Sequence, residues 1–418
     1  MLYYYKIITT CAAPLMPLWL KLRALRGKED AGRINERFGT SSYGRPPGKL
    51  LWIHASSVGE ANSVLALINQ TKKRFPSLNI LLTTGTVTSA ALMKQRLPAG
   101  VLHQFAPIDT PQATERFMRH WLPDVVWFVE SELWPNLIDT AKRYFCLMAL
   151  INARMSERSF HNWKKYQNVA NALLSSFQLC FAQSEQDAGR LRALGARKVM
   201  VTGNLKYDAP LLPCDESELL TMKTALAGRT LWLAASTHPG EEKMVAEAHQ
   251  KLSKMHPDLL TVIVPRHPER GDNIARELQA YGGVALRSKK ETITRDTAFY
   301  IADTLGELGL FYRLCEVAFM GGSLIKHGGQ NPLEPAQLAC AILTGPHTHN
   351  FRDITIEMVA HRAVIVVKDA VQLATSLHDL LSNTARRSEY QANAKNFTTQ
   401  KSGSSQFILD IFAPVFAS

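Results

Sequence analysis

The sequence predicts an α/β protein with two successive doubly wound domains, each built on a parallel sheet. Short apolar runs typical of buried strands alternate with helical patterns along most of its 418 residues, and this alternation is typical of parallel sheets. The alternation stops in a turn-rich stretch that begins at Gly203 and then starts again. Because a chain of this length is too long for one ordinary core, two domains are expected.

The strands are expected at apolar runs that end in small or polar residues. In the first half these runs are 50–54, 80–84, 102–105, 125–129, 146–151, 179–182 and 199–202, with helices over 61–75 and 110–121 between them. In the second half they are 231–235, 260–264, 298–301, 317–320, 342–343 and 364–367. Two such halves would face each other across a cleft, a common place for a ligand. The arrangement resembles the GT-B architecture of nucleotide-sugar transferases.

The same patterns divide the chain into five predicted segments. They are an apolar segment over 1–22, a first domain over 23–205, a linker over 206–225, a second domain over 226–395 and a helical segment over 396–418. We expect the last segment to pack back toward the first domain.

The formal net charge of +12 indicates a polyanionic partner: nucleic acid, an anionic membrane or a phosphorylated substrate. Nucleic acid is the least favoured of these, because no zinc-finger spacing, RNA-binding aromatic signature or arginine-rich tail accompanies the charge. The six cysteines are scattered, with no Cys-x-x-Cys pair. This spacing favours reduced core thiols over disulfides or a metal site.

Residues 2–22 are almost wholly apolar or aromatic, and Lys6 is the only charge before Lys21. Their length approaches one bilayer crossing, although Pro14 and Pro17 interrupt the segment. Basic residues follow from Lys21 onward, so the positive-inside rule would keep the rest of the chain in the cytoplasm. A spanning helix, a helix lying at the membrane interface and an ordinary buried helix all fit this pattern.

Residues 52–60, Trp-Ile-His-Ala-Ser-Ser-Val-Gly-Glu, join a predicted buried strand to a predicted helix. Glu60 therefore falls on the first helical turn beyond the carboxyl end of a strand, where open α/β sheets bind ligands. The N-terminus of a helix also presents free N–H groups and positive potential, which favour a bound anion. Glu60 can equally be no more than a favourable residue for the first turn of a helix.

Three loops in the second half follow predicted strands and suit a bound phosphate. Arg266 and His267 offer a bidentate cation and a hydrogen-bond donor. Gly306 allows close approach of the backbone, and Glu334 follows Pro332 on the first turn of a predicted helix, where it would hold a ribose diol. One such loop alone could need its glycine only for a tight turn. Three such loops on successive strand ends favour one ligand site. The motif Gly-x-Gly-x-x-Gly does not follow any predicted strand, which argues against a nicotinamide enzyme.

Taken in order, the motifs resemble those of the 3-deoxy-D-manno-octulosonic acid (Kdo) transferases, membrane-associated enzymes that place Kdo on the lipid A precursor. The resemblance covers the whole chain and includes the apolar N-terminus, residues 52–60, Glu130-Ser-Glu-Leu-Trp-Pro-Asn, Gly203-Asn-Leu-Lys-Tyr-Asp and the three later loops. It implies a GT-B-like fold with a hydrophobic membrane-anchor helix over 1–22, an acceptor-binding domain over 23–205 and a CMP-Kdo-binding domain over 226–395.

The resemblance also implies an activity, a place and partners. The enzyme would move Kdo from CMP-Kdo to lipid IVA with inversion, in lipopolysaccharide biosynthesis, on the cytoplasmic side of the inner membrane. Its partners would be CMP-Kdo, lipid IVA and the anionic surface of that membrane, and not nucleic acid. No cofactor is expected, and no metal in the transfer step.

Roles for single residues follow from the same resemblance. Glu60 would be the catalytic base, and Glu130 and Lys206 match positions assigned to transition-state stabilisation. A carboxylate cannot directly stabilise an anion, so Glu130 would orient a base, help a cationic sugar centre or serve the structure, while Lys206 could also be merely solvated. The segments that hold CMP would comprise Arg266, His267, Gly306, Glu307, Leu308, Asn331, Pro332, Leu333 and Glu334.

Two other classes of protein fit part of the pattern. A soluble nucleotide-sugar epimerase of the same architecture would lack the apolar N-terminal segment and the basic surface. A membrane-tethered binding protein would not need Glu60 and Lys206 at one site.

Overall fold

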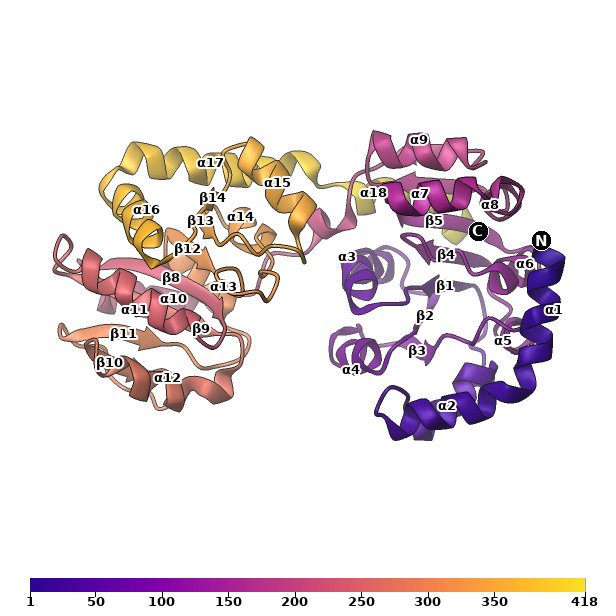
Figure 1. Ribbon diagram of the computed structural model, residues 1–418, viewed down its shortest axis with the longest axis horizontal. Helices are drawn as coiled ribbons and strands as arrows, with labels where there is room; N and C mark the ends of the chain where they lie inside the picture. Colours follow the sequence, from indigo (N-terminus) through magenta and orange to yellow (C-terminus); the bar gives the residue numbers. More distant parts are fainter. Residues whose placement is uncertain (418) are drawn as a thin grey trace. The chain divides into compact units, whose positions relative to one another are not determined.

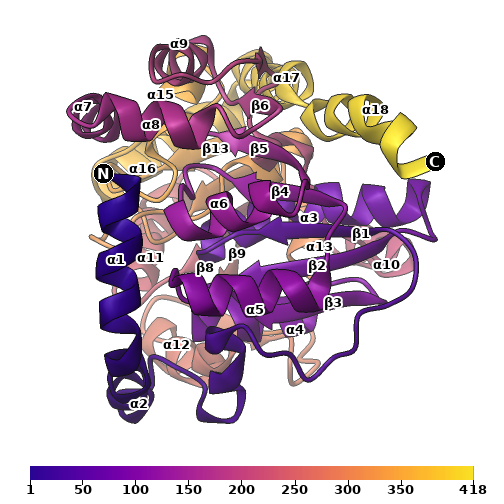
Figure 2. The ribbon, with the colours of Figure 1, turned by 90° about the vertical axis from the view of Figure 1, so that its right-hand side faces the viewer.

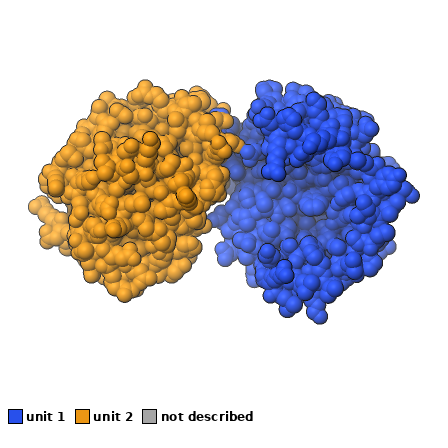
Figure 3. All heavy atoms as spheres, viewed as in Figure 1, with its two compact units in different colours: residues 1–209, 401–418 blue, residues 210–400 orange. Residues whose placement is uncertain are grey.

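The computed structural model describes residues 1–417. The protein contains two seven-stranded parallel sheets, each packed against helices (Figure 1). Residues Met1–Ala209 and Lys401–Ser418 form one compact unit, and Pro210–Gln400 form the other (Figure 3). We call them unit 1 and unit 2. The predicted fold class of two doubly wound parallel α/β domains is confirmed.

The sheet of unit 1 has the strand order β3-β2-β1-β4-β5-β6-β7, and every neighbouring pair is parallel. Its strands are β1 (Leu50–His54), β2 (Asn79–Thr84), β3 (Val101–Phe105), β4 (Val125–Val129), β5 (Leu147–Ala153), β6 (Leu179–Ala182) and β7 (Val199–Val201). The order reverses between β1 and β4. The carboxyl ends of these two strands therefore flank the switch point, where open α/β sheets bind ligands.

Helices connect these strands, and the unit contains two buried apolar layers. The helices are α3 (Val58–Arg74), α4 (Val87–Arg96), α5 (Pro111–Trp121), α6 (Pro135–Arg143), α7 (Glu157–Lys164), α8 (Gln167–Leu174) and α9 (Glu185–Ala193). Serine or threonine N-caps that accept a backbone N–H begin α3, α4, α5, α7 and α9. Trp52 and Phe128 lie in one apolar layer, and Trp127 and Phe181 lie in the other.

The sheet of unit 2 has the order β10-β11-β9-β8-β12-β13-β14, again with parallel neighbours. Its strands are β8 (Thr230–Thr237), β9 (Leu259–Pro265), β10 (Gly283–Leu286), β11 (Thr297–Ile301), β12 (Val317–Met320), β13 (Ala341–Thr344) and β14 (Ile365–Val366). The order reverses between β8 and β12, which is the switch point of this sheet. The sequence patterns did not predict β10, a short edge strand that starts at the second glycine of the pair Gly282-Gly283.

The helices of unit 2 are short except near its C-terminal end. They are α10 (Glu216–Ala225), α11 (Glu241–Leu252), η4 (Pro268–Arg270), α12 (Gly271–Leu278), α13 (Leu308–Leu314), α14 (Leu333–Gln337), α15 (Arg352–Ala360), α16 (Ala370–Ser382) and α17 (Thr384–Lys401). The stretch predicted as a linker over 206–225 is largely ordered. Leu205–Asp208 form η3 within unit 1, and α10 belongs to unit 2.

The last helix, α18 (Ser404–Ala417), belongs to unit 1 although it follows unit 2 in the chain. The carboxylate of Asp208 accepts hydrogen bonds from the backbone N–H groups of Gly403 (2.6 Å) and Ser405 (2.5 Å) at the start of this helix. Phe412 of α18 packs edge-on against Trp127, with ring centroids 5.1 Å apart. The Gly203–Asp208 motif therefore holds α18 as well as leading out of unit 1.

The N-terminal segment forms α1 (Leu2–Ala12), η1 (Ala13–Leu15) and α2 (Met16–Leu25). Figure 2 shows α1 along one edge of unit 1, and its residues contact α5 and α6. No residue of α1 is buried, so the interpretation of an ordinary buried helix is wrong. In the described residues, 1–417, no helix combines the length and apolar character needed to cross a membrane.

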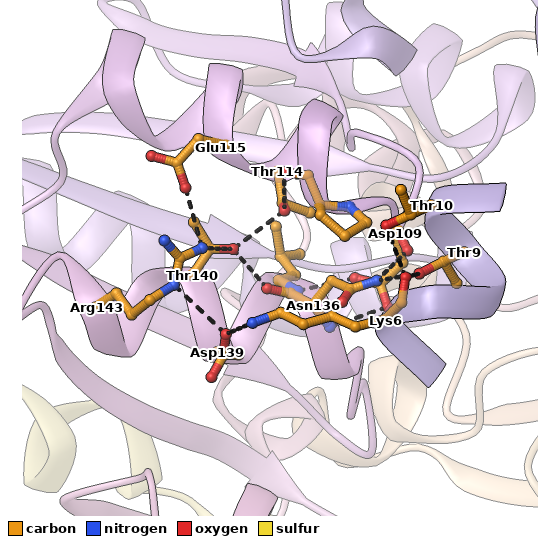
Figure 4. A network of polar contacts seen from close by, with 12 residues as sticks. Lys6, Thr9, Thr10, Asp109, Thr114, Glu115, Asn136, Asp139, Thr140 and Arg143 are labelled. Carbon is orange, nitrogen blue, oxygen red and sulfur yellow. Dashed lines mark hydrogen bonds and ion pairs between the residues drawn. The ribbon is translucent and has the colours of Figure 1, made fainter. Parts of the chain in front are cut away.

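Polar contacts attach α1 to unit 1 (Figure 4). The hydroxyl of Tyr5 donates to Asp109 (2.9 Å), and Lys6 pairs with Asp139 of α6 (2.7 Å). Thr9 accepts a hydrogen bond from the amide of Asn136 (3.0 Å). Tyr5, Lys6 and Thr9 thus face the rest of unit 1, whereas Ile7 and Ile8 are exposed.

Candidate active site

Glu60 is held at the start of α3 by a capping box. The hydroxyl of Ser57 accepts a hydrogen bond from the Glu60 N–H (3.3 Å) and donates to Glu60 Oε1 (2.9 Å). The N–H of Ser56 donates to the other carboxylate oxygen, Oε2, at 2.7 Å. Both oxygens therefore have donors, and the carboxylate is fixed at the carboxyl end of β1.

The surroundings of Glu60 strengthen it as a base. Burial raises the pKa of Glu60 above its ordinary value, and the negative charges of Glu132 and Glu130 raise it further. The hydrogen bonds from Ser57 and Ser56 act in the opposite direction without cancelling the rise. A carboxylate with a raised pKa is a better proton acceptor near neutral pH.

Glu130 lies at the carboxyl end of β4, across the switch point from Glu60. Its backbone is in the left-handed region, with φ +57°, a conformation that costs a non-glycine residue on the order of 1–3 kcal/mol and collects at functional sites. Its N–H donates to the carbonyl of Ile151 (2.9 Å). Burial raises the pKa of Glu130, and the positive charges of Lys206 and Arg154 oppose that rise.

Lys206 is placed beside Glu130 by side chains that fix η3. The amide oxygen of Asn152 accepts a hydrogen bond from the Leu205 N–H (3.1 Å), and the amide oxygen of Asn204 accepts one from the Lys206 N–H (3.0 Å). Asn152 is buried and also has a left-handed backbone, with φ +53°. The structure thus places Glu60, Glu130 and Lys206, which stand in three different sequence motifs, near one another in unit 1.

Three neighbours in this group were not predicted. His54 and Glu132 lie 3.7 Å apart between Nε2 and Oε2, and Arg154 acts on Glu130 from the end of β5. His54 and Glu132 both stand inside motifs that the sequence had already singled out, so the motif strings contained the information. Arg154 stands in no motif, and only the sheet order places it near β4.

In unit 2, the predicted residues Arg266 and His267 directly follow β9 and are exposed. Gly306 has φ +85° and precedes Leu308, the first residue of α13. Glu307 is already engaged, because Arg287 donates to both of its carboxylate oxygens, at 2.6 and 2.5 Å. These bonds hold the pKa of Glu307 below its ordinary value. The Glu307 side chain therefore serves the fold, and its backbone is what remains for a ligand.

Asn331, Pro332, Leu333 and Glu334 form the approach to α14. The side-chain oxygen of Asn331 accepts from the Leu333 N–H (3.1 Å), and its amide donates to Glu334 Oε1 (3.2 Å). Pro332 and Leu333 are buried, whereas Glu334 is half-buried. Asn331 thus positions the Glu334 carboxylate, and Glu334 is the member of this group best placed to meet a ligand.

The end of β8 adds residues that the sequence patterns did not single out. Glu241 is fully buried, and its carboxylate accepts hydrogen bonds from the N–H groups of His238 (3.0 Å), Gly322 (2.6 Å), Ser323 (3.0 Å) and Leu324 (3.0 Å). It thereby holds the glycine loop after β12 against the end of β8. The ring of His238 stacks on that of His327 at 3.7 Å.

Comparison with known proteins identifies the family. The family model for 3-deoxy-D-manno-octulosonic-acid transferase (kdotransferase) matches residues 32–209. A protein of Arabidopsis thaliana named as a probable mitochondrial 3-deoxy-D-manno-octulosonic acid transferase is 38% identical over 94% of this chain and 90% of its own length. The chain belongs to the Kdo transferase family. The resemblance found in the sequence motifs is thereby confirmed.

A second Kdo transferase, from Haemophilus influenzae, is 33% identical over 99% of this chain and 98% of its own length. Kdo transferases are glycosyltransferases, so this chain is an enzyme of that class. The epimerase and the tethered binding protein are therefore wrong as interpretations. The solved structure of UDP-GlcNAc 2-epimerase from Neisseria meningitidis is nevertheless similar, with a TM-score of 0.57 and 14% identity over 88% of this chain and 100% of that chain. That similarity concerns the GT-B-like fold alone.

Proposed function

We propose that this Kdo transferase moves Kdo from CMP-Kdo to lipid IVA in one inverting displacement, with Glu60 as the base. The observation that carries the proposal is the position of Glu60. It lies at the switch point of unit 1, with both carboxylate oxygens fixed and its pKa raised by burial.

A base is needed because a sugar hydroxyl is too weak an acid to attack unaided. Loss of the proton to Glu60 as the new bond forms lowers the barrier for the attack. A single displacement on the anomeric carbon, with no enzyme nucleophile, inverts its configuration. The capping box fits this role because it fixes the carboxylate before the acceptor arrives.

Glu130, Lys206 and Arg154 suit the reacting Kdo. Kdo carries a carboxylate, and the two cations that act on Glu130 supply an attractive site for it. A carboxylate such as Glu130 stabilises positive charge that develops at the sugar centre as the leaving group departs. The strained backbone of Glu130 is consistent with a side chain that must be aimed at a substrate.

In unit 2, we assign the binding of CMP to three loop ends. Arg266 and His267 would contact the phosphate, the backbone of Gly306–Leu308 would approach the nucleotide closely, and Glu334 would hold the ribose diol. CMP leaves as a stable phosphate anion, so cationic side chains and backbone N–H groups suffice to stabilise it. We therefore propose a transfer step that uses neither a cofactor nor a metal.

We also propose that α1 and α2 attach the enzyme to the cytoplasmic face of the inner membrane. Ile8, Leu18 and Leu22 are 65%, 62% and 49% exposed, although water disfavours such side chains. Lys21 and Lys28 are also exposed, and basic residues near an anionic membrane each contribute about 1 kcal/mol to binding. Since lipid IVA is an acylated and phosphorylated lipid, the enzyme must meet it at a membrane surface.

Release of CMP from CMP-Kdo tests the proposed pair of substrates. The full-length enzyme should release CMP in the presence of lipid IVA and almost none without it. Deacylated acceptor and a lipid without the sugar backbone serve as the matched controls. Equal CMP release with and without lipid IVA would show hydrolysis rather than transfer and would contradict the assignment of this acceptor.

A further inference from the structure

The buried His54 and the half-buried Glu132 form a pair at the end of β1 that has no role in the function proposed so far. His54 is the last residue of β1 and is 2% exposed, and Glu132 lies in the loop between β4 and α6. Nε2 of His54 is buried without a hydrogen-bond partner, 3.7 Å from Glu132 Oε2. The indole N–H of Trp134 donates to the same Glu132 oxygen at 2.5 Å.

The tautomer of His54 follows from its other neighbours. The indole of Trp52 can only donate, so the hydroxyl oxygen of Thr83 accepts its hydrogen bond (2.9 Å). The Thr83 hydroxyl then has one hydrogen to give, and Nδ1 of His54 lies nearer (3.0 Å) than the carbonyl of Ile53 (3.4 Å). With Nδ1 as the acceptor, the N–H of a neutral His54 is on Nε2, the nitrogen that faces Glu132.

Ser56 connects this pair to the base. Its backbone N–H donates to Glu60 Oε2 at 2.7 Å, two residues after His54, whose ring lies 3.7 Å from Glu132. The turn at the end of β1 therefore contacts both carboxylates, Glu132 beside His54 and Glu60 bound to Ser56. Burial favours the neutral form of Glu132, but His54, Trp134 and Ser56 outweigh burial and hold the pKa of Glu132 below its ordinary value.

We propose that Glu132, held by His54, is a positioning residue whose negative charge makes Glu60 a stronger base for the acceptor hydroxyl. This inference rests on the proposed function, in which Glu60 is the base. Glu132 itself does not exchange a proton during the reaction: it remains ionised, and its charge disfavours the ionised form of Glu60 until the acceptor proton arrives.

Charged groups other than Glu132 also act on Glu60 and its neighbours. Those that face Glu60 or its carboxylate neighbours are Glu130, Lys206, Arg154 and Asp187, and the ring of His54 faces Glu132. On the elements packed against α3, Arg96 of α4 contacts Asn62, and Asp410 of α18 pairs with Arg74 at the far end of the helix. None of these is changed in the variants below, so the effect of Glu132 is read against a constant background.

The test is the pH dependence of kcat/KM for lipid IVA in the full-length enzyme and in Glu132→Gln. Activity falls at low pH as the base becomes protonated, which gives an acid limb. Removal of the neighbouring charge should move that limb to lower pH by roughly half a unit to one unit, and a weaker base should lower the plateau a few-fold. Glu132→Asp, which keeps the charge, should return the limb toward the native position. Glu185→Gln, at an exposed carboxylate of α9, should leave the profile unchanged.

The outcomes separate this inference from the proposed function. If Glu60→Gln retains normal turnover, the base assignment is wrong and the inference is wrong with it. If Glu60→Gln is inactive but Glu132→Gln lowers the plateau without moving the acid limb, Glu132 is only structural and the base assignment survives. A melting curve of Glu132→Gln, measured in parallel, shows whether a lost plateau reflects unfolding. If the variant is unfolded, the pH profile of Glu132→Asp decides, and a displaced limb there would contradict the inference.

Discussion

At the scale of single residues, carboxylates that folding removes from water are central to unit 1. Glu60 and Glu130 both have a pKa raised by burial, whereas Glu132 between them is kept ionised by its neighbours. A site in which the pKa of one carboxylate is raised and that of another is lowered is typical of acid–base catalysis. Each can be tested by an amide substitution that keeps size and removes the charge.

For Glu60, the substitution Glu60→Gln should lower the rate of transfer by about 100- to 10,000-fold, because the proton acceptor is lost. Its binding of CMP should be unchanged, since the residues assigned to CMP belong to unit 2. Single-turnover kinetics with CMP-Kdo and lipid IVA measure the first effect, and calorimetry with CMP the second. Near-normal turnover in the variant would show that another group removes the proton.

The direction of the Glu130 pKa shift determines how this residue changes the stability of the protein with pH. Because the pKa of Glu130 is raised in the folded protein, its contribution to stability is full below its unfolded pKa and is lost as pH rises through the folded value. Glu130→Gln should therefore raise the melting temperature by about 1–3 °C near pH 8 and have no such effect near pH 4.

Glu115 is the matched control of opposite sign. Its hydrogen bond from Tyr144 and its ion pair with Arg143 lower its pKa, so its stabilisation is present at neutral pH and is lost as pH falls. Glu115→Gln should thus lower the melting temperature at pH 8. The same direction of change in both variants would contradict the assigned cause.

In unit 2, Arg266→Ala should weaken the binding of CMP by roughly tenfold or more, as expected for loss of one charge-assisted contact of about 1.5–3 kcal/mol. Glu334→Ala should also weaken it, while binding of the lipid acceptor changes little in both. Isothermal calorimetry with CMP and with lipid IVA measures the two affinities. Glu307→Gln is the control for a contact that serves the fold, because this side chain is already bound to Arg287. Its effect should be a lower melting temperature, which distinguishes it from the loss of a ligand contact.

At the scale of elements, α1 is joined to the loop that carries Glu130 and Glu132. Asp109 accepts from the Tyr5 hydroxyl and also from the N–H groups of Asn136 and Leu137 (3.2 and 2.8 Å) at the start of α6 (Figure 4). The loop from Glu130 to Trp134 ends at that helix. The N-terminal segment thus also supports the start of α6 and the loop before it.

Tyr5→Phe should therefore destabilise the enzyme by about 1–2 kcal/mol, because the half-buried carboxylate of Asp109 loses a hydrogen-bond donor. Hydrogen exchange at the amides of Asn136 and Leu137 should become faster in this variant. Tyr4→Phe is the matched control, because the Tyr4 side chain is 66% exposed. Equal effects of the two substitutions would show that the loss of stability does not come from the hydrogen bond between Tyr5 and Asp109.

The elements also show what could be predicted from sequence. Strands such as β1 and β4 are continuous apolar runs, and helices such as α3 and α5 begin at a Ser or Thr cap, so both kinds of element were visible. β10 was not, because two glycines precede an apolar run of only three residues. The helical turn η3 was read as linker because Gly203 and Asn204 signal a turn, whereas the buried side chains of Leu205 and Tyr207 fix it to unit 1.

The site was predictable only where a motif was continuous in sequence. Glu60, Glu130 and Lys206 each stand in a recognisable string, and the sheet order brings them together. Arg154 and Glu241 do not, because their roles depend on contacts between strands that are distant in the sequence. Glu307 stands in a predicted loop, but its side chain is bound by Arg287, an ion pair that no local pattern indicates.

At the scale of the whole molecule, the proposed function requires that the enzyme work at a membrane. The combined substitution of Ile8, Leu18 and Leu22 by serine removes exposed apolar surface and leaves Tyr5, Lys6 and Thr9 in place. Each apolar side chain contributes on the order of 1 kcal/mol to insertion, so sedimentation with anionic vesicles should fall strongly. Transfer to detergent-dispersed lipid IVA should be nearly normal.

A variant that is folded but inactive in detergent would show that these side chains contact the acceptor directly. Unchanged sedimentation would instead contradict the proposed membrane attachment. Vesicles of zwitterionic lipid separate the two contributions, since they remove the attraction for Lys21 and Lys28 but not the apolar one.

The central claim is the transfer of Kdo from CMP-Kdo to lipid IVA with Glu60 as the base, and product mass tests it most directly. The native enzyme is incubated with both substrates, and the lipid is analysed by mass spectrometry beside an identical reaction with Glu60→Gln. The native reaction should yield lipid IVA increased by the mass of one or more Kdo residues, and the variant reaction should yield unmodified lipid IVA in the same time. Unmodified lipid IVA from the active native enzyme, or equal product from the variant, would contradict the claim.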